Sequence, residues 1–143
     1  MSRAFLLAGA LTLSACAVTP PMTPEEQVVA FGPLLPAPSE AVLEAAKILN
    51  YPRLLQRPTL GEMHAGYPRA AWVDEAQGRV VLDCIVQPSG RLACRAEDDG
   101  QPKYDFETSA LLLSSRVRVG LVDENGESAI GRRLRLPMAF RLY

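Results

Sequence analysis

Residues 78–96 constrain the fold of this chain more than any other segment, because they have the sequence of a β-hairpin. Two runs that suit strands, 79–87 and 91–96, flank Pro88-Ser89-Gly90. Proline favours the second position of a type I turn, and the glycine can take the left-handed conformation of a three-residue hairpin loop. This loop places Cys84 opposite Cys94, at a non-hydrogen-bonded site where facing side chains approach most closely.

The hairpin register predicts a disulfide and an apolar face. A cross-strand bond between Cys84 and Cys94 fits the register without distortion, and the alternative is two reduced cysteines packed in a core. The other face sets Asp83 opposite Arg95 as a solvated ion pair worth at most about 1 kcal/mol. The expected apolar face consists of Val80, Leu82, Cys84, Val86, Leu92, Cys94 and Ala96.

The N-terminal residues have the pattern of an export signal. Arg3 precedes a short apolar run, 4–12, and Leu13-Ser14-Ala15-Cys16 follows. Such a run is too short to span a bilayer and is typical of a secretory signal. The ending resembles the lipobox of bacterial lipoproteins, in which the cysteine is lipidated and becomes the mature N-terminus. The alternative is an ordinary signal peptide with a chance cysteine.

This resemblance implies a signal peptide over 1–15, lipid on Cys16 and a location at the periplasmic face of the cell envelope. Ala17 favours the outer membrane over the inner one. The chain has three cysteines. Lipid on Cys16 leaves Cys84 and Cys94 as a pair, which suits an oxidising compartment. The net charge of −1 shows no basic excess, so we expect no nucleic-acid partner.

The segment before the compact domain is predicted in two parts. Residues 16–38 contain six prolines and should form an extended, lipidated tether. Residues 39–66 should hold a helix over 39–49, capped by Ser39, and then an irregular stretch. The expected apolar stripe of that helix is Val42, Ala45, Ala46 and Leu49.

Residues 67–143 are predicted to form the compact domain. A short helix over 69–75 and a longer one over 106–115, capped by Asp105, should cover the sheet. Residues 117–131 suit either a small hairpin or a loop around Asn125-Gly126. The side chains expected to pack on the cysteine face of the hairpin are Phe106, Ala110, Leu113 and Val117.

The last strand has the clearest alternation in the chain. Pro137 lacks an N–H, which favours an edge strand. One face is apolar and consists of Leu134, Leu136, Met138, Phe140 and Leu142. We therefore predict an α+β, ββαβ domain with a three-stranded antiparallel sheet, helices on one face, and the strand order 2-1-3 within the domain.

An ordered set of residues in this domain resembles the C-terminal domain of TonB and its relatives. The set comprises Tyr67-Pro68 followed by Ala70 or Ala71, Gly78-x-Val80-x-Leu82, Gly90, Phe106 and Ala110, Asn125-Gly126, and Leu136-Pro137-Met138-x-Phe140. The resemblance covers about residues 67–142. It implies a domain that binds a short extended peptide by strand addition, and in the family that peptide is the TonB box of an outer-membrane transporter.

We place the expected peptide-binding edge on the last strand, where free backbone groups await a partner. A second copy of this chain is an alternative occupant of the same edge. TonB also has an N-terminal transmembrane helix and a long spacer, which this sequence lacks, so motor-coupled energy transduction is not expected. The residues of the predicted edge are Leu134, Arg135, Leu136, Met138 and Phe140.

Other sites are weaker. His64 is the only histidine, and Glu62-x-His64 lacks a third ligand, so we expect no metal, no cofactor and no enzyme activity. The acidic residues 97–99 are interpreted as a turn. The alternative function is an envelope-structural lipoprotein that binds cell-wall polymer or anionic lipid through an arginine-rich sheet face. That face would consist of Arg91, Arg95, Arg133, Arg135 and Arg141.

Overall fold

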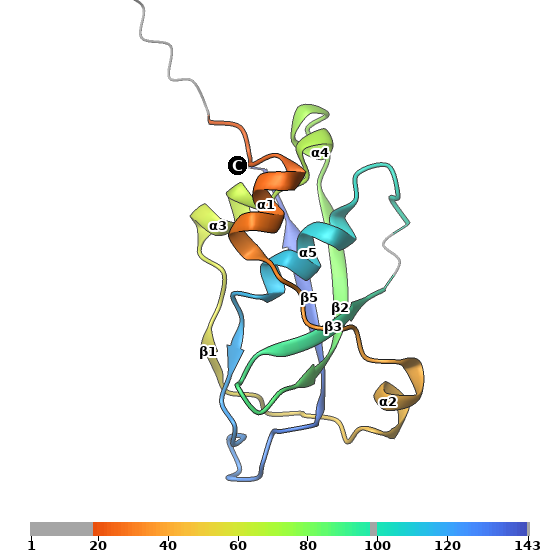
Figure 1. Ribbon diagram of the computed structural model, residues 1–143, viewed down its shortest axis with the longest axis vertical. Coiled ribbons are helices and arrows are strands. Elements are labelled where there is room, and N and C mark those ends of the chain that lie inside the picture. The colour runs from red at the N-terminus through yellow and green to blue at the C-terminus, as the bar shows by residue number, and fades with distance from the viewer. Residues whose placement is uncertain (1–18, 98–99, 143) are drawn as a thin grey trace, which may run out of the picture.

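The computed structural model describes residues 19–97 and 100–142, and its centre is a three-stranded antiparallel sheet (Figure 1). The strands are β2 (Gly78–Val86), β3 (Leu92–Ala96) and β5 (Arg133–Phe140), in the order β3-β2-β5. The prediction of one sheet is incomplete. A second, two-stranded sheet pairs β1 (Leu54–Gln56), from the stretch expected to be irregular, with β4 (Arg118–Val119).

The predicted hairpin register is confirmed. Cys84 is the partner of Cys94, and Val86 is the partner of Leu92. The Gln87 N–H donates to the Arg91 C=O at 2.9 Å and closes the loop. Gly90 has a φ of 82°, the left-handed conformation that the three-residue loop needs.

The disulfide between Cys84 and Cys94 is present, and the two Cα atoms lie 4.0 Å apart. The cysteines are separated by 10 positions in the sequence, so the bond restricts a short loop of the unfolded chain. We expect the double variant Cys84→Ala/Cys94→Ala to lose about 2.5–3 kcal/mol of unfolding free energy on the chain-entropy estimate. Urea unfolding of the variant, beside the oxidised and the reduced protein, measures this loss. A variant as stable as the oxidised protein would contradict it.

The helix α5 (Phe106–Ser114) packs on the cysteine face of the hairpin, as predicted, and contacts both β2 and β3. The predicted contact residues Phe106, Ala110, Leu113 and Val117 are all buried. Asp105 occupies the N-cap position with a φ of 56°, but its side chain makes no capping hydrogen bond to the helix backbone. Its carboxylate instead accepts a hydrogen bond from Thr108 Oγ1 at 2.7 Å.

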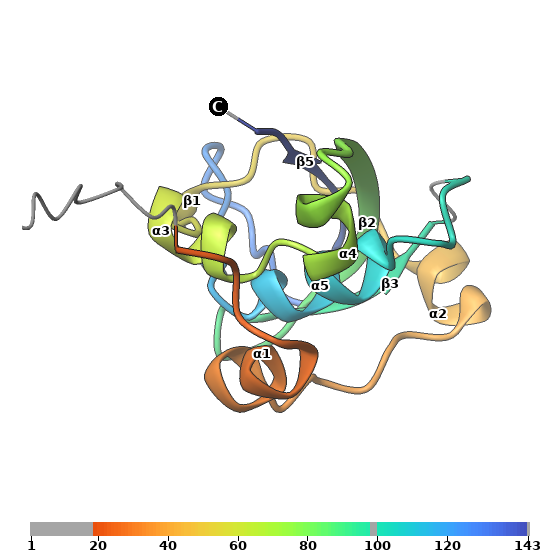
Figure 2. The ribbon, with the colours of Figure 1, turned by 90° about the horizontal axis from the view of Figure 1, so that it is seen from above.

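The prediction of an extended tether over 16–38 is wrong for residues 24–31, which form the helix α1 (Pro24–Phe31). Figure 2 shows α5 lying between α1 and the strands, and α1 packs directly on α5. Thr23 and Glu26 form a capping box, and Pro24 stands at the first helical position. The buried Gln27 side chain donates to the backbone carbonyls of Met22, Ala65 and Tyr67. These bonds fix α1 to the domain.

The helix α2 (Glu40–Ala45) begins after Ser39, as predicted, but ends four residues early. It stops because residues 47–49 pair with Arg133 of β5 instead of continuing the helix. Leu43 is buried, whereas Val42 of the predicted stripe is exposed. The helix contacts β2 from the face that carries Asp83 and Arg133, opposite to α5. The prediction that the helices lie on one face of the sheet is therefore wrong.

Two further short helices complete the fold. The first, α3 (Leu60–Ala65), occupies part of the predicted irregular stretch, and Thr59 and Glu62 form its capping box. The second, α4 (Arg69–Val73), follows Pro68 and agrees with the predicted helix over 69–75. Both helices stand beside the end of β5 (Figure 1), where they line a cavity with Phe140.

Candidate functional site

One side of β5 is an open edge. On its other side β5 pairs with β2 from Phe140 to Arg133. At the start of the strand, the Arg133 N–H donates to the Lys47 C=O at 2.9 Å, and the Leu49 N–H donates to the Arg133 C=O at 2.8 Å. The backbone groups of Arg133 therefore point away from β2. Residue 48 forms a parallel bridge with Arg133, so the chain itself has begun a strand addition here.

The direction of backbone hydrogen bonds alternates along an antiparallel strand. Because Arg133 points away from β2, the backbones of Arg135, Pro137 and Ala139 point the same way. Among residues 19–97 and 100–142, none of these backbone groups has a hydrogen-bond partner. Their side chains are also exposed. The edge is thus open to an added strand from Arg135 to Ala139.

The predicted edge residues divide between this edge and the core. Leu134, Met138 and Phe140 are buried, Leu136 is half-buried, and their backbones face β2. Of the predicted set, only Arg135 directs its backbone to the open side. Sequence reasoning missed Ala139. A proline in a strand stands where no N–H is needed, so Pro137 marks the open side of β5, and by alternation Ala139 points to the same side.

A cavity of about 280 Å³ opens at the C-terminal end of this edge. Its lining is mostly apolar and comes from α3, α4 and the end of β5. The lining residues are Leu60, Met63, His64, Tyr67, Trp72, Ala139, Phe140, Arg141 and Leu142. Tyr67 is held by a hydrogen bond from its hydroxyl to the Ala76 C=O at 2.5 Å, and burial raises the pKa of Tyr67 above its usual value. The hydrogen bond holds Tyr67 at the wall of the cavity.

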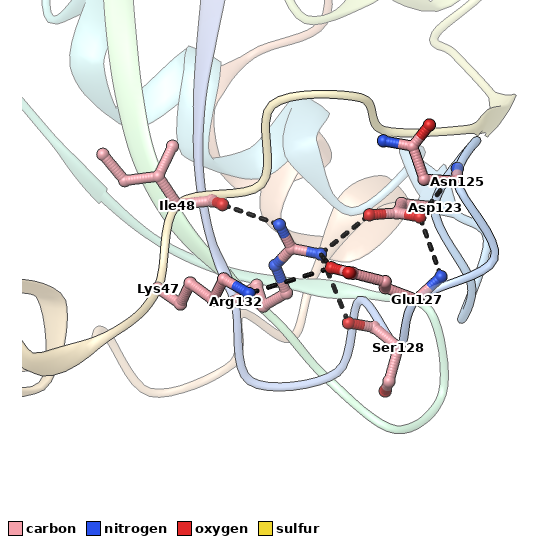
Figure 3. Close-up of polar contacts among 7 residues, drawn as sticks. All are labelled: Lys47, Ile48, Asp123, Asn125, Glu127, Ser128 and Arg132. Carbon is pink, nitrogen blue, oxygen red and sulfur yellow. Dashed lines mark hydrogen bonds and ion pairs between the residues drawn. The ribbon is translucent and has the colours of Figure 1, made fainter.

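The N-terminal end of the edge is fixed by a buried ion pair (Figure 3). Arg132 lies between two segments, donating from Nη2 to the Ile48 C=O and from Nη1 to Asp123 Oδ2, both at 2.8 Å. Asp123 Oδ1 accepts the N–H groups of Asn125 and Glu127, each at 2.9 Å. These bonds hold residues 47–49 against β5. Sequence reasoning missed these contacts of Arg132 and Asp123. Their only signal in the sequence was Asp123 itself, two residues before the Asn125-Gly126 turn.

The pKa of Asp123 is lowered, first by the hydrogen bond from the Glu127 N–H and then by Arg132 and Asn125. Its side chain is only 2% exposed. Residues 117–131, predicted as a hairpin or a loop, hold one isolated bridge between Val122 and Ser128 beyond β4. The carboxylate of Asp123 thus organises a loop that has little regular pairing of its own.

The predicted solvated pair of Asp83 with Arg95 is wrong. The two residues are partners in the register, but Asp83 is buried and its ion pair is with Arg133 of β5. Arg133 donates from Nε to Asp83 Oδ1 at 2.8 Å and from Nη2 to Oδ2 at 2.5 Å. The central position of β2 places Asp83 between both neighbouring strands, and α2 covers it.

The arginine face is partly neutralised within the chain. Arg133 is bound to Asp83, and Arg135 donates to both carboxylate oxygens of Glu97, at 2.7 and 2.9 Å. Arg91 Nη2 donates to the Pro33 C=O at 3.4 Å. Glu97 is thus an ion-pair partner, and residues 98 and 99 of the predicted acidic turn lie outside the described residues. In the described part of the chain, two of these five arginines are therefore ion-paired with a carboxylate, and the bond of Arg91 to a neutral carbonyl leaves its charge in place.

His64 and Glu62, which were considered as a pair of metal ligands, bind different partners. His64 Nε2 lies 2.6 Å from the Thr19 C=O, and Glu62 binds Arg116 at 2.8 Å. Within the described part of the chain, no three histidine, cysteine or acidic side chains gather as metal ligands would. Cys16, the predicted lipidation site, lies outside the described residues.

Within the ranges described here, no helix has the length and apolar character needed to span a membrane. Comparisons of the chain with protein-family models, with curated proteins and with solved structures found no match.

Proposed function

We propose that this protein is a membrane-anchored periplasmic lipoprotein whose β5 edge binds an extended peptide of a partner protein by strand addition. The observation that carries the proposal is the open backbone edge from Arg135 to Ala139. An exposed row of unpaired backbone groups is a template for another strand, and peptide-binding domains use it in this way.

The chain's own contacts support this use of the edge. Residues 47–49 already pair in parallel with Arg133, which is the first position of the same edge. Pro137 accepts a hydrogen bond but donates none, so an added peptide would receive donors only from Arg135 and Ala139. The edge therefore suits a short peptide better than a long sheet.

The resemblance of residues 67–142 to TonB C-terminal domains supports the same class of ligand. It also names a candidate partner, a peptide of a TonB-dependent outer-membrane transporter. The lipobox-like sequence ending at Cys16 supports an anchor in the membrane, with the outer membrane favoured. A lipid anchor does not couple to a proton motor, so the proposed role is interaction and not energy transduction.

Photocrosslinking in cells tests the proposal. A benzophenone amino acid at position 135 should capture a partner, and Ala139→Pro in the same protein should reduce that capture about tenfold, which corresponds to one lost hydrogen bond at the upper end of its usual worth. The Ala139 N–H does not pair with β2, so the proline should leave folding intact, as Pro137 does. Ala139→Thr is the matched control, because it keeps the N–H.

The identity of the captured protein decides the outcome. An outer-membrane transporter segment, lost with Ala139→Pro and kept with Ala139→Thr, is the expected result. Capture of a second copy of this chain, or of nothing, would show that the edge does not serve a partner. Loss of capture with Arg141→Ala but not with Ala139→Pro would favour binding through the arginines instead.

A further inference from the structure

We infer that a peptide bound at the β5 edge places one large apolar side chain, preferably aromatic, in the cavity between α3, α4 and the end of β5. This inference rests on the proposed strand addition and adds the sequence class that the edge selects. A backbone ladder alone binds any extended sequence, so selectivity requires a pocket for a side chain.

The geometry of the sheet directs a side chain into this cavity. Paired residues of neighbouring strands point to the same face of a sheet. A peptide residue beside Phe140 would therefore point to the core face, as Phe140 does. The cavity lies on that face, and Ala139, whose backbone groups are open, stands on its rim. An added strand that uses Ala139 thus places its next side chain at the mouth of the cavity.

The size and lining of the cavity favour one apolar side chain. Its volume of about 280 Å³ lies just below the usual range of small-molecule pockets, about 300–1,000 Å³. Leu60 lines it and is 82% exposed, so an apolar wall stands uncovered beside the edge. Trp72 and Met63 supply further apolar surface. An aromatic side chain buries about 150–250 Å² and would cover this wall.

Charge adds a second preference. Arg141 lines the same cavity, and in the described ranges no carboxylate pairs with it. The neighbouring Arg135, in contrast, is occupied by Glu97. An acidic residue next to the apolar one would find its partner at Arg141. The peptide class is therefore an extended segment with an apolar anchor beside an acidic residue.

The closed end of the edge makes such an anchor necessary. Residues 47–49 occupy Arg133, so a peptide has only the short stretch from Arg135 onward. Strand pairing without side-chain contacts allows the register to slip by two residues. A side chain fixed in the cavity at the far end would set a single register. The cavity wall from α3 lies before residue 67, outside the region that resembles TonB domains, whereas the other lining residues lie within that region.

A phage-displayed library of random dodecapeptides, selected on the purified protein, tests the inference. Selected peptides whose binding is weakened by Ala139→Pro should share an aromatic or large aliphatic residue. Replacing that residue of the peptide with alanine should weaken its binding about 10–100-fold. Leu60→Asp should cause a similar loss. Aspartate suits the first turn of α3, so this variant should remain folded. Leu55→Asp is the control, because Leu55 is 70% exposed and does not line the cavity.

The outcomes separate the two proposals. Peptides that Ala139→Pro weakens but that share no apolar residue, or that bind Leu60→Asp as well as Leu55→Asp, would overturn the cavity as the anchor site and leave strand addition standing. A library that yields no peptide sensitive to Ala139→Pro would overturn strand addition, and the anchor with it. In the expected result, replacing the anchor residue of the peptide with alanine does not weaken its binding to the Leu60→Asp protein any further.

Discussion

Replacing Asp123 with alanine should lower the midpoint of thermal unfolding by about 10 °C or more, the effect of breaking a buried ion pair by removing one partner. The Asp123 side chain is 2% exposed and that of Arg132 is 11% exposed, so solvent cannot replace the lost carboxylate. The variant leaves the N–H groups of Asn125 and Glu127 without their acceptor as well. Glu124→Ala is the control, because Glu124 is the exposed neighbour. A midpoint equal to that of the control would contradict the prediction.

The same carboxylate predicts a pH dependence. The pKa of Asp123 is lower in the folded protein than its unfolded value of about 3.9, so the ionised form stabilises the fold above that pH. This stabilisation is lost as the pH falls through the lowered pKa of the folded state. Between pH 4 and more acidic conditions, the stability of the unmodified protein should fall more steeply than that of Asp123→Asn. Urea unfolding across this range measures both slopes, and equal slopes would contradict the assignment.

The sequence contains two helix-start patterns that the predictions above did not include. Thr23-Pro24-Glu25-Glu26 and Thr59-Leu60-Gly61-Glu62 both have the capping-box pattern, and both begin helices. The prolines of residues 16–38 outweighed the first signal, although Pro24 itself suits the first helical turn. Local rules could therefore have found α1 and α3. They could not have found that Gln27 binds the carbonyls of Ala65 and Tyr67, because that contact depends on the packed domain.

The hairpin and the long strand were predictable because their patterns are local and strong. The turn fixed the partner of Cys84, and the alternation of residues 133–142 fixed which face of β5 is buried. Ion-pair choice was not predictable in this way. Asp83 has Arg95 on one neighbouring strand and Arg133 on the other side, and the approach of α2 and the burial of that face decide between them.

The edge strand of the candidate site was predicted from the sequence, but the closure and the cavity at its two ends were not. Pro137 indicated an edge strand, and β5 lies at the edge of its sheet. The closure at Arg133 comes from residues 47–49, and one wall of the cavity near Ala139 comes from α3. Their sequences show no sign of where they will lie against β5. Long-range placement of short segments was thus the part that local patterns could not supply.

The core around Phe106 gives the second large effect. Phe106 is fully buried and meets the rings of Tyr67, Tyr104 and Phe140 at centroid distances of 6.1, 5.9 and 5.2 Å. We expect Phe106→Ala to cost about 3–5 kcal/mol of unfolding free energy, since the lost contacts leave a cavity that these neighbours cannot fill. Urea unfolding measures the loss, and a cost below about 1 kcal/mol, the size of a typical surface change, would contradict this view of the core.

Gly78 turns this prediction into a test of geometry. A Cβ at Gly78 would lie 2.6 Å from Phe106 Cε2, so Gly78→Ala alone should destabilise the protein by about 1–3 kcal/mol through overpacking. In the Phe106→Ala protein the ring is gone, and Gly78→Ala should there be neutral or stabilising, because alanine restricts the unfolded chain more than glycine. Gly61→Ala is the control, because its Cβ would meet only Thr59 Oγ1, at 3.9 Å. Additive costs of Gly78→Ala and Phe106→Ala would show that the ring does not set the need for glycine at position 78.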